Sequence, residues 1–135
     1  MAVHLYVFLT IFHKMVVDIY LLISHNGKSI KGFIIIMRIL ALSTLKLFWQ
    51  QPKYQDSEQP LKAWYDEAKH ASWHKPQDIK DKYRNASFIA DNRVVFNIHG
   101  NKYRLIVALK YEFGVGYIRF IGTHKQYDTI DAKTI

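Results

Sequence analysis

Apolar and polar residues alternate from residue 93 to residue 110, and this pattern predicts a β-hairpin. Gly100-Asn101 is a typical two-residue hairpin turn. A turn there places Asn97 opposite Arg104, and the alternation then sorts the residues onto two sheet faces. The apolar face carries Val94, Phe96, Ile98, Tyr103, Leu105, Val107 and Leu109. The polar face carries Arg93, Val95, Asn97, His99, Lys102, Arg104, Ile106, Ala108 and Lys110.

A second turn, at Phe113-Gly114, is predicted to continue the sheet into a third strand. This turn pairs Val107 with Phe120. Because side chains alternate along a strand, Phe120 then joins the apolar face, whereas Arg119 and Thr123 join the polar face. Both hairpins gather basic side chains on the same face, which indicates an anionic ligand.

Upstream of the hairpins, apolar residues recur at helical spacing. The predicted elements are a buried strand over 38–42, a helix capped at Ser43 or Thr44, a polar loop over 52–57, a helix opening at Asp56 or Ser57, a short helix from Pro76 and an extended segment over 87–90. Their inward residues are Leu45, Phe48, Trp49, Leu61, Trp64, Tyr65, Ala68, Ile79 and Tyr83. This order predicts an α+β domain, with two or three N-terminal helices packed on one face of a mostly antiparallel sheet and the other face left open.

The chain of 135 residues is large enough for one domain with its own core, and it contains no cysteine. Disulfides, thiolate metal sites and a cysteine nucleophile are therefore excluded. The formal net charge is +8. Between residues 84 and 125 there are seven lysines and arginines but only two acidic residues, so much of the excess lies on the predicted sheet. This distribution favours a polyanionic partner, and the alternative is a solvated basic surface.

The first 36 residues differ from the rest, because 23 of them are apolar. A signal peptide is not indicated, since no positive charge precedes Lys14 in the chain. A membrane helix over residues 5–23 would hold two charged side chains in its middle, so we do not expect a membrane protein. We expect an atypical hydrophobic extension, either a start-site artefact before Met37 or an added helix and strand. Residues 37–135 are then the functional domain.

The segment from Thr123 to Asp128 leaves the last predicted strand at the edge of the basic face. Cleavage of RNA without a metal needs a base for the ribose 2′-hydroxyl, an acid for the departing 5′-oxygen and cations around the phosphorane. His124 and Tyr127 can transfer the protons, and Arg104 and Arg119 can clamp the phosphate in a bidentate manner. The alternative is that Tyr127 packs in the core and His124 is merely solvated.

Other polar residues near this constellation are candidate phosphate or base contacts. They are Arg93, Asn97, His99, Lys102 and Lys125. His70 and His74 have the i,i+4 spacing of metal ligands on a helix, but the sequence offers no third ligand nearby. We therefore expect neither a metal site nor a cofactor.

Four blocks of sequence carry a resemblance to a known family. They are MRILALSTL at 37–45, LKAWY at 61–65, RVVFNIHGNKYRL at 93–105 and YIRFIGTHKQYDTID at 117–131. The blocks are distributed from one end of residues 37–135 to near the other. This region resembles the HigB-type toxins of the RelE-like mRNA interferases over essentially its whole length.

The resemblance implies a RelE-like fold and a small cytoplasmic toxin that cleaves messenger RNA, in many relatives on the ribosome. It also implies silencing by a helix-turn-helix antitoxin of the HigA type. By position, Arg119 corresponds to a strand arginine near the scissile phosphate. His124 and Tyr127 correspond to a C-terminal acid and base pair, and which of them is the acid stays open.

Two other classes of function remain as alternatives. The first is a non-catalytic protein that binds single-stranded RNA or the ribosome, with Tyr117 or Tyr127 stacked on a base. The second is a membrane-associated accessory protein held by residues 5–23.

Overall fold

The computed structural model describes residues 36–135. The expectations for the hydrophobic extension concern residues 1–35 and so lie outside the described residues. Between residues 36 and 135, no helix is both long enough and apolar enough to cross a membrane.

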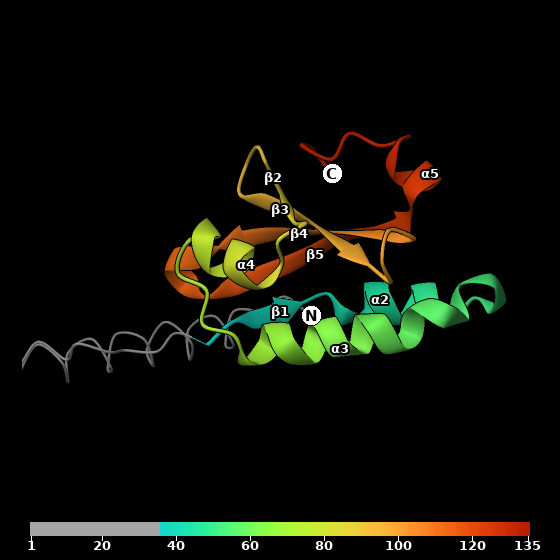
Figure 1. The fold of residues 1–135 in the computed structure, drawn as a ribbon, viewed down its shortest axis with the longest axis horizontal. Coiled ribbons are helices and arrows are strands. Elements are labelled where there is room, and N and C mark those ends of the chain that lie inside the picture. Colours follow the sequence, from blue (N-terminus) through green and yellow to red (C-terminus); the bar gives the residue numbers. More distant parts are fainter. Residues whose placement is uncertain (1–35) are drawn as a thin grey trace, which may run out of the picture. The chain divides into compact units, whose positions relative to one another are not determined.

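Within residues 36–135, five strands form one sheet in the order β1-β5-β4-β3-β2 (Figure 1). The strands are β1 Arg38–Leu40, β2 Ser87–Ile89, β3 Arg93–Ile98, β4 Tyr103–Lys110 and β5 Val115–Thr123. β1 runs parallel to β5, and the other neighbouring pairs are antiparallel. The predicted class, α+β with a mostly antiparallel sheet, is confirmed. The parallel pairing of β1 with β5 is a feature that the sequence patterns did not predict.

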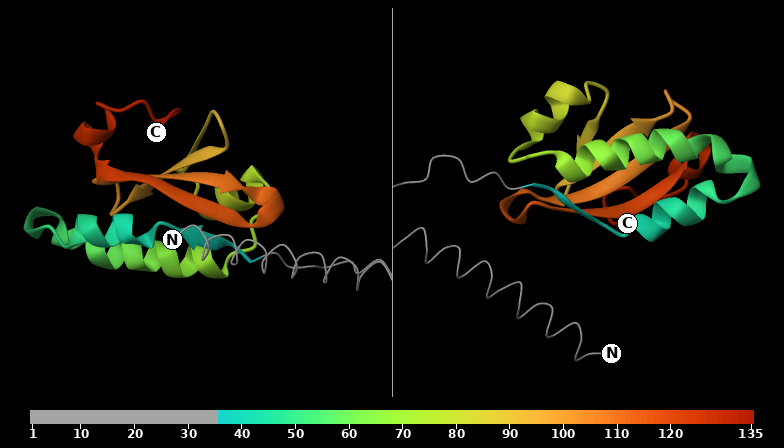
Figure 2. Two further views of the ribbon diagram at one scale, coloured as in Figure 1. Left: turned by 180° about the vertical axis from the view of Figure 1, so that it is seen from behind. Right: turned by 90° about the horizontal axis from the view of Figure 1, so that it is seen from below.

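The helices are α2 Leu42–Trp49, α3 Glu58–His70, α4 Pro76–Lys82 and α5 His124–Tyr127, with the 3₁₀ helices η1 Pro52–Ser57 and η2 Tyr111–Phe113. In Figure 1, α2 and α3 lie on one side of the sheet, whereas α5 and the C-terminal end of the chain lie on the other. The left view of Figure 2 shows the same division from behind. The predicted packing of N-terminal helices on one sheet face is therefore confirmed.

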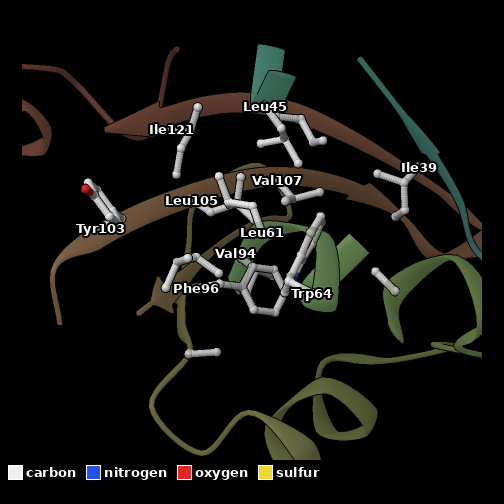
Figure 3. Close-up of a cluster of buried hydrophobic side chains, with 14 of the residues drawn as sticks. Ile39, Leu45, Leu61, Trp64, Val94, Phe96, Tyr103, Leu105, Val107 and Ile121 are labelled. Carbon is white, nitrogen blue, oxygen red and sulfur yellow. The ribbon is translucent and has the colours of Figure 1, made fainter. Parts of the chain in front are cut away.

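The apolar face packs against the helices and forms the core (Figure 3). Phe96 is 1% exposed, and its ring centroid lies 5.3 Å from that of Trp64 and 5.1 Å from that of Tyr83. The inward residues predicted for the helices all belong to this core or pack against it. Burial of each large apolar side chain contributes about 1.5–3 kcal/mol to folding, so these helical faces supply much of the stability.

Two local predictions about the helices are wrong. The first helix begins at Leu42, before the predicted caps, because Ala41 has a left-handed φ of 67° and turns the chain out of β1. The predicted polar loop is the 3₁₀ helix η1, which buries Tyr54. The ring of Tyr54 stacks on that of Phe48 with centroids 4.4 Å apart, which anchors this segment in the core.

The first hairpin has the predicted register, with Asn97 opposite Arg104. The second does not. Val107 pairs with Ile118 rather than with Phe120. Ile106, the residue before Val107 on β4, pairs with Phe120. The pairing therefore shifts by one residue between Ile106 and Val107, at a β-bulge in which Arg119 is the extra residue of β5. Phe120 consequently lies on the polar face, and its predicted place in the core is wrong.

The connection between β4 and β5 explains part of this difference. Four residues join Lys110 to Val115, made of η2 and of Gly114 with a φ of 62°, so the predicted two-residue turn does not form. At the far end of the strand, Thr123 pairs with Tyr103. The prediction that Thr123 lies on the polar face is therefore also wrong.

Candidate functional site

Cross-strand pairing arranges the polar face in three rows. The rows are Arg93-Ala108-Tyr117, Val95-Ile106-Phe120 and Asn97-Arg104-Gly122. The first and last rows are four residues apart on β3, which is roughly 13 Å along the strand. Val95 and Ile106 in the middle row are 3% and 0% exposed. The polar face therefore has an arginine near each end and an apolar middle.

At one end of this face, two arginines bind the end of the chain. Nε and Nη2 of Arg93 donate to the main-chain oxygen of Ile135 at 3.1 and 2.6 Å. Nε of Arg119 donates to the same oxygen at 3.2 Å. Arg93 is 9% exposed, whereas Arg119 is an exposed residue. The prediction that this sheet face is left open is therefore wrong in part, because the C-terminal segment covers this end.

At the other end, Arg104 is half-buried and lies opposite Gly122. Its Nη1 donates to the main-chain oxygen of Asn101 at 3.1 Å. A Cβ added at Gly122 would lie 2.5 Å from Cζ of Phe120, so the ring of Phe120 covers this glycine. The ring of Tyr127 lies beside that of Phe120, with centroids 6.5 Å apart. Gly122 therefore has Arg104 opposite it in the sheet and the ring of Phe120 over it, and Tyr127 lies beside that ring.

The short helix α5 carries the predicted acid and base. Thr123 caps it, since the Thr123 hydroxyl accepts from the Gln126 amide at 3.1 Å and the Gln126 side chain accepts from the Thr123 amide at 2.8 Å. Nε2 of Gln126 also donates to the Tyr54 hydroxyl at 3.2 Å, which ties α5 to η1. His124 is exposed, and its Nδ1 lies 3.4 Å from a carboxylate oxygen of Asp128. Lys125 on the same helix is exposed.

An open pocket of about 410 Å³ lies beside Asn97. It is lined by Lys82, Tyr83, Arg84, Asn85, Ala86, Asn97 and Gly100. Two cations and two amides are groups that can bind phosphates and the edges of unpaired bases. Because Asn97 is half-buried and pairs with Arg104, the pocket adjoins the row that carries Arg104.

His99 and Lys102, predicted as RNA contacts, interact with Asp56 of η1. Lys102 Nζ and the Tyr103 hydroxyl both donate to the Asp56 carboxylate, and Nε2 of His99 lies 3.8 Å from it. The hydrogen bonds from Lys102 and Tyr103 hold the pKa of Asp56 below its ordinary value. The bond to Asp56 in turn raises the pKa of Lys102. These two predicted contacts are thus already engaged with a carboxylate.

This cluster predicts a pH-dependent contribution to stability. Asp56→Asn is expected to lower the free energy of unfolding at pH 7, because the neutral amide loses the charge-assisted bonds. A carboxyl group whose pKa is lower in the folded state than in the unfolded state stabilises the fold at pH values above its unfolded pKa of about 3.9. This stabilisation is lost as the pH falls through the pKa of the folded state. Urea unfolding of the parent chain and of the variant, at pH 7 and at acid pH, measures the difference in their free energies of unfolding. This difference should be smaller at acid pH. Glu112→Gln, at an exposed residue, is the control, and an equal loss at both pH values would contradict the prediction.

Within residues 36–135, no hydrogen bond or ion pair joins any two of Arg104, Arg119, His124 and Tyr127. Arg119 interacts with Ile135, which also binds Arg93, and Arg104 lies in the row next to Phe120 and Tyr127. The assignment of these four residues to one catalytic site stays a prediction.

The sequence patterns did not predict the positions of three further residues in this region. Asp128 could have been found from its i,i+4 spacing to His124 on a helix. Phe120 was assigned to the wrong face. The role of Ile135 has no local signal, because its partners Arg93 and Arg119 lie 42 and 16 residues away in the sequence.

N-terminal helices on one face of a five-stranded, mostly antiparallel sheet are consistent with the fold of RelE-like toxins. The chain belongs to the HigB toxin family. The model of this family, described as the RelE-like toxic component of a toxin-antitoxin system, matches residues 57–130. The resemblance predicted from the sequence is therefore confirmed, and the family implies an antitoxin as partner. No match was found among curated proteins.

Proposed function

We propose that the protein is the toxin of a type II toxin-antitoxin system, that its domain over residues 37–135 cleaves messenger RNA on the ribosome, and that a HigA-type antitoxin neutralises it. Family membership supports the toxin role. The observation that supports the cleavage proposal is the arrangement at the end of β5, where α5 and His124 follow: Arg104 lies opposite Gly122, the ring of Phe120 covers this glycine, and the ring of Tyr127 lies beside that of Phe120.

The proposed reaction is attack of the ribose 2′-hydroxyl on the adjacent phosphorus. One of His124 and Tyr127 removes the hydroxyl proton, and the other protonates the 5′-oxygen as the bond from phosphorus to that oxygen breaks. Asp128, 3.4 Å from Nδ1 of His124, orients the imidazole. Arg104 and Arg119 stabilise the negative charge that grows on the phosphorane. The products are a 2′,3′-cyclic phosphate and a 5′-hydroxyl.

The polar face and the adjoining pocket suggest a path for single-stranded RNA. Asn97 lies between Arg104 and the pocket lined by Lys82 and Arg84, so a strand whose phosphate reaches Arg104 can place a neighbouring nucleotide there. Lys125 on α5 is exposed to meet the strand on the other side of the scissile phosphate. His99 and Lys102 are expected to contribute less, because they interact with Asp56.

The ends of the products test the reaction. The full-length protein is incubated with labelled single-stranded RNA in the presence and absence of EDTA, and in parallel with translating ribosomes. We expect 2′,3′-cyclic phosphate and 5′-hydroxyl ends that EDTA does not abolish on free RNA, or that form only on ribosomes if these are required. Ends with a 3′-hydroxyl and a 5′-phosphate would contradict the mechanism.

A non-catalytic RNA-binding protein is the second candidate. It is favoured by Tyr117, which is 41% exposed in the row of Arg93 and offers a ring on which a base can stack. Salt-sensitive RNA binding without cleavage, on free RNA and on ribosomes alike, would support this candidate and contradict the first.

A further inference from the structure

The hydrogen bonds that attach the C-terminal segment, residues 131–135, to the sheet come from two arginines. Its own hydrogen bonds are internal: the amides of Thr134 and Ile135 donate to the main-chain oxygen of Asp131 at 3.2 and 3.1 Å, and the amide of Lys133 donates to the Asp131 carboxylate. In the described structure, the hydrogen bonds from this segment to the sheet are those that the Ile135 oxygen accepts from Arg93 and Arg119. A segment held in this way can leave the sheet without unfolding it.

Arg93 is unusual among the charged residues of the described structure because it is buried. Its side chain is 10% exposed, and the acidic side chain with which it forms an ion pair, that of Asp91, lies 3.9 Å away and is itself 78% exposed. A buried guanidinium is costly unless it is paired with an anion or fully hydrogen-bonded. Its strongest contacts here are to a single main-chain oxygen of Ile135.

Three N–H groups from two arginines converge on that one oxygen. Guanidinium groups bind phosphate oxygens through the same parallel donors. A phosphate of RNA presents two free oxygens to these donors, whereas Ile135 presents one in the hydrogen bonds of the structure, so RNA can use this pair of arginines more fully.

We infer that Arg93 and Arg119 form a phosphate-binding site for the RNA backbone, and that the C-terminal segment occupies this site in the free protein. RNA must displace Ile135 before its phosphate reaches Arg93, so the segment lowers the affinity of the protein for RNA. This inference rests on the proposed function, since it takes RNA as the ligand.

A full-length variant with a released segment tests the inference. Thr134→Pro removes the amide that donates to Asp131 and disfavours the turn at Lys133, so Ile135 should leave the arginines. Thr134→Ala keeps this amide and is the matched control. The probe is a fluorescent single-stranded oligoribonucleotide with 2′-O-methyl groups, which cannot be cleaved by 2′-hydroxyl attack. Its dissociation constant is measured by anisotropy at several salt concentrations.

Thr134→Pro is expected to bind the probe roughly tenfold more tightly, a typical size for coupling between two sites, whereas Thr134→Ala should bind like the parent chain. The salt dependence should steepen by about 0.7 in log–log slope for each added phosphate contact. Arg93→Gln in both backgrounds should abolish the difference between them. Equal affinity and equal salt slope for the proline and alanine variants would overturn the inference.

Hydrogen exchange on the unmodified chain gives an independent measurement. Saturating the protein with the probe should speed exchange of the Thr134 and Ile135 amides, because the displaced segment loses its turn. Unchanged or slower exchange would overturn the inference. If the exchange is unchanged or slower but the unmodified chain cleaves ordinary RNA in these same preparations, the inference about the C-terminal segment is wrong and the proposed enzyme still stands. Displacement of the segment without any cleavage would instead contradict the proposed enzyme.

Discussion

Replacing His124 by alanine and Tyr127 by phenylalanine is expected to lower the rate of RNA cleavage by about 10²- to 10⁴-fold, the usual contribution of a general acid or base. RNA binding should change little, because the variants keep Arg93, Arg104 and Arg119. Single-turnover cleavage of a labelled RNA gives the rate, on ribosomes if these are required. Anisotropy with a 2′-O-methyl probe gives the affinity.

The structure offers matched controls for both substitutions. His70 is exposed on α3, where its Nδ1 lies 2.8 Å from the main-chain oxygen of Asp66, and Tyr65 is half-buried on the same helix. The helix α3 lies on the side of the sheet opposite α5 (Figure 1). His70→Ala and Tyr65→Phe should leave cleavage unchanged. Full cleavage by the His124 and Tyr127 variants would remove these two residues from the mechanism.

The parts of the fold that were predicted correctly are those for which two independent local patterns in the sequence agree, or for which the pattern does not depend on exact element boundaries. The register of β3 and β4 follows from the Gly100-Asn101 turn and also from the alternation on both strands, and the two agree. The buried faces of α2 and α3 follow from helical spacing of large apolar residues, and burial there does not depend on where each helix begins. Such features tolerate small errors at the ends of elements.

The register of β5 shows where local patterns fail. The run from Ile118 to Phe120 alternates like a regular strand, and nothing in it marks Arg119 as the residue of a bulge. The aromatic ring of Phe120 suits either face. In the structure it lies over Gly122 on the polar face, where only a residue without a side chain leaves room for it. A bulge of this kind redirects side chains, and here it separates Arg119 from the regular alternation of the strand.

The candidate site was predicted at the level of faces and not of contacts. The sequence placed Arg93 among exposed RNA contacts, but whether an arginine on a strand is open or covered depends on segments far away in the chain. Ile135 covers Arg93 from 42 residues away, and Asp56 binds Lys102 from 46 residues away. Contacts over such separations follow from the assembled fold, and no short pattern encodes them.

Phe96 connects the core to the polar face, because it alternates on β3 with Val95 and Asn97. A loss of packing beneath β3 is therefore expected to loosen the strand that carries the RNA-facing residues. The ring of Phe96 meets Trp64 at 5.3 Å and Trp73 at 6.1 Å, so its removal leaves a cavity between large rigid rings that cannot easily close.

Phe96→Ala is accordingly expected to lower the free energy of unfolding by about 3–5 kcal/mol, the usual loss for a phenylalanine deleted from a core. Since domains of this size are stable by only about 5–15 kcal/mol, the variant should be near the limit of folding at 37 °C. Urea titration of the full chain, followed by tryptophan fluorescence, gives the loss. Phe113→Ala, at a side chain that is 67% exposed, should change stability by less than about 0.5 kcal/mol. A loss below about 1 kcal/mol for Phe96→Ala would mean that the aromatic cluster is looser than its contacts indicate.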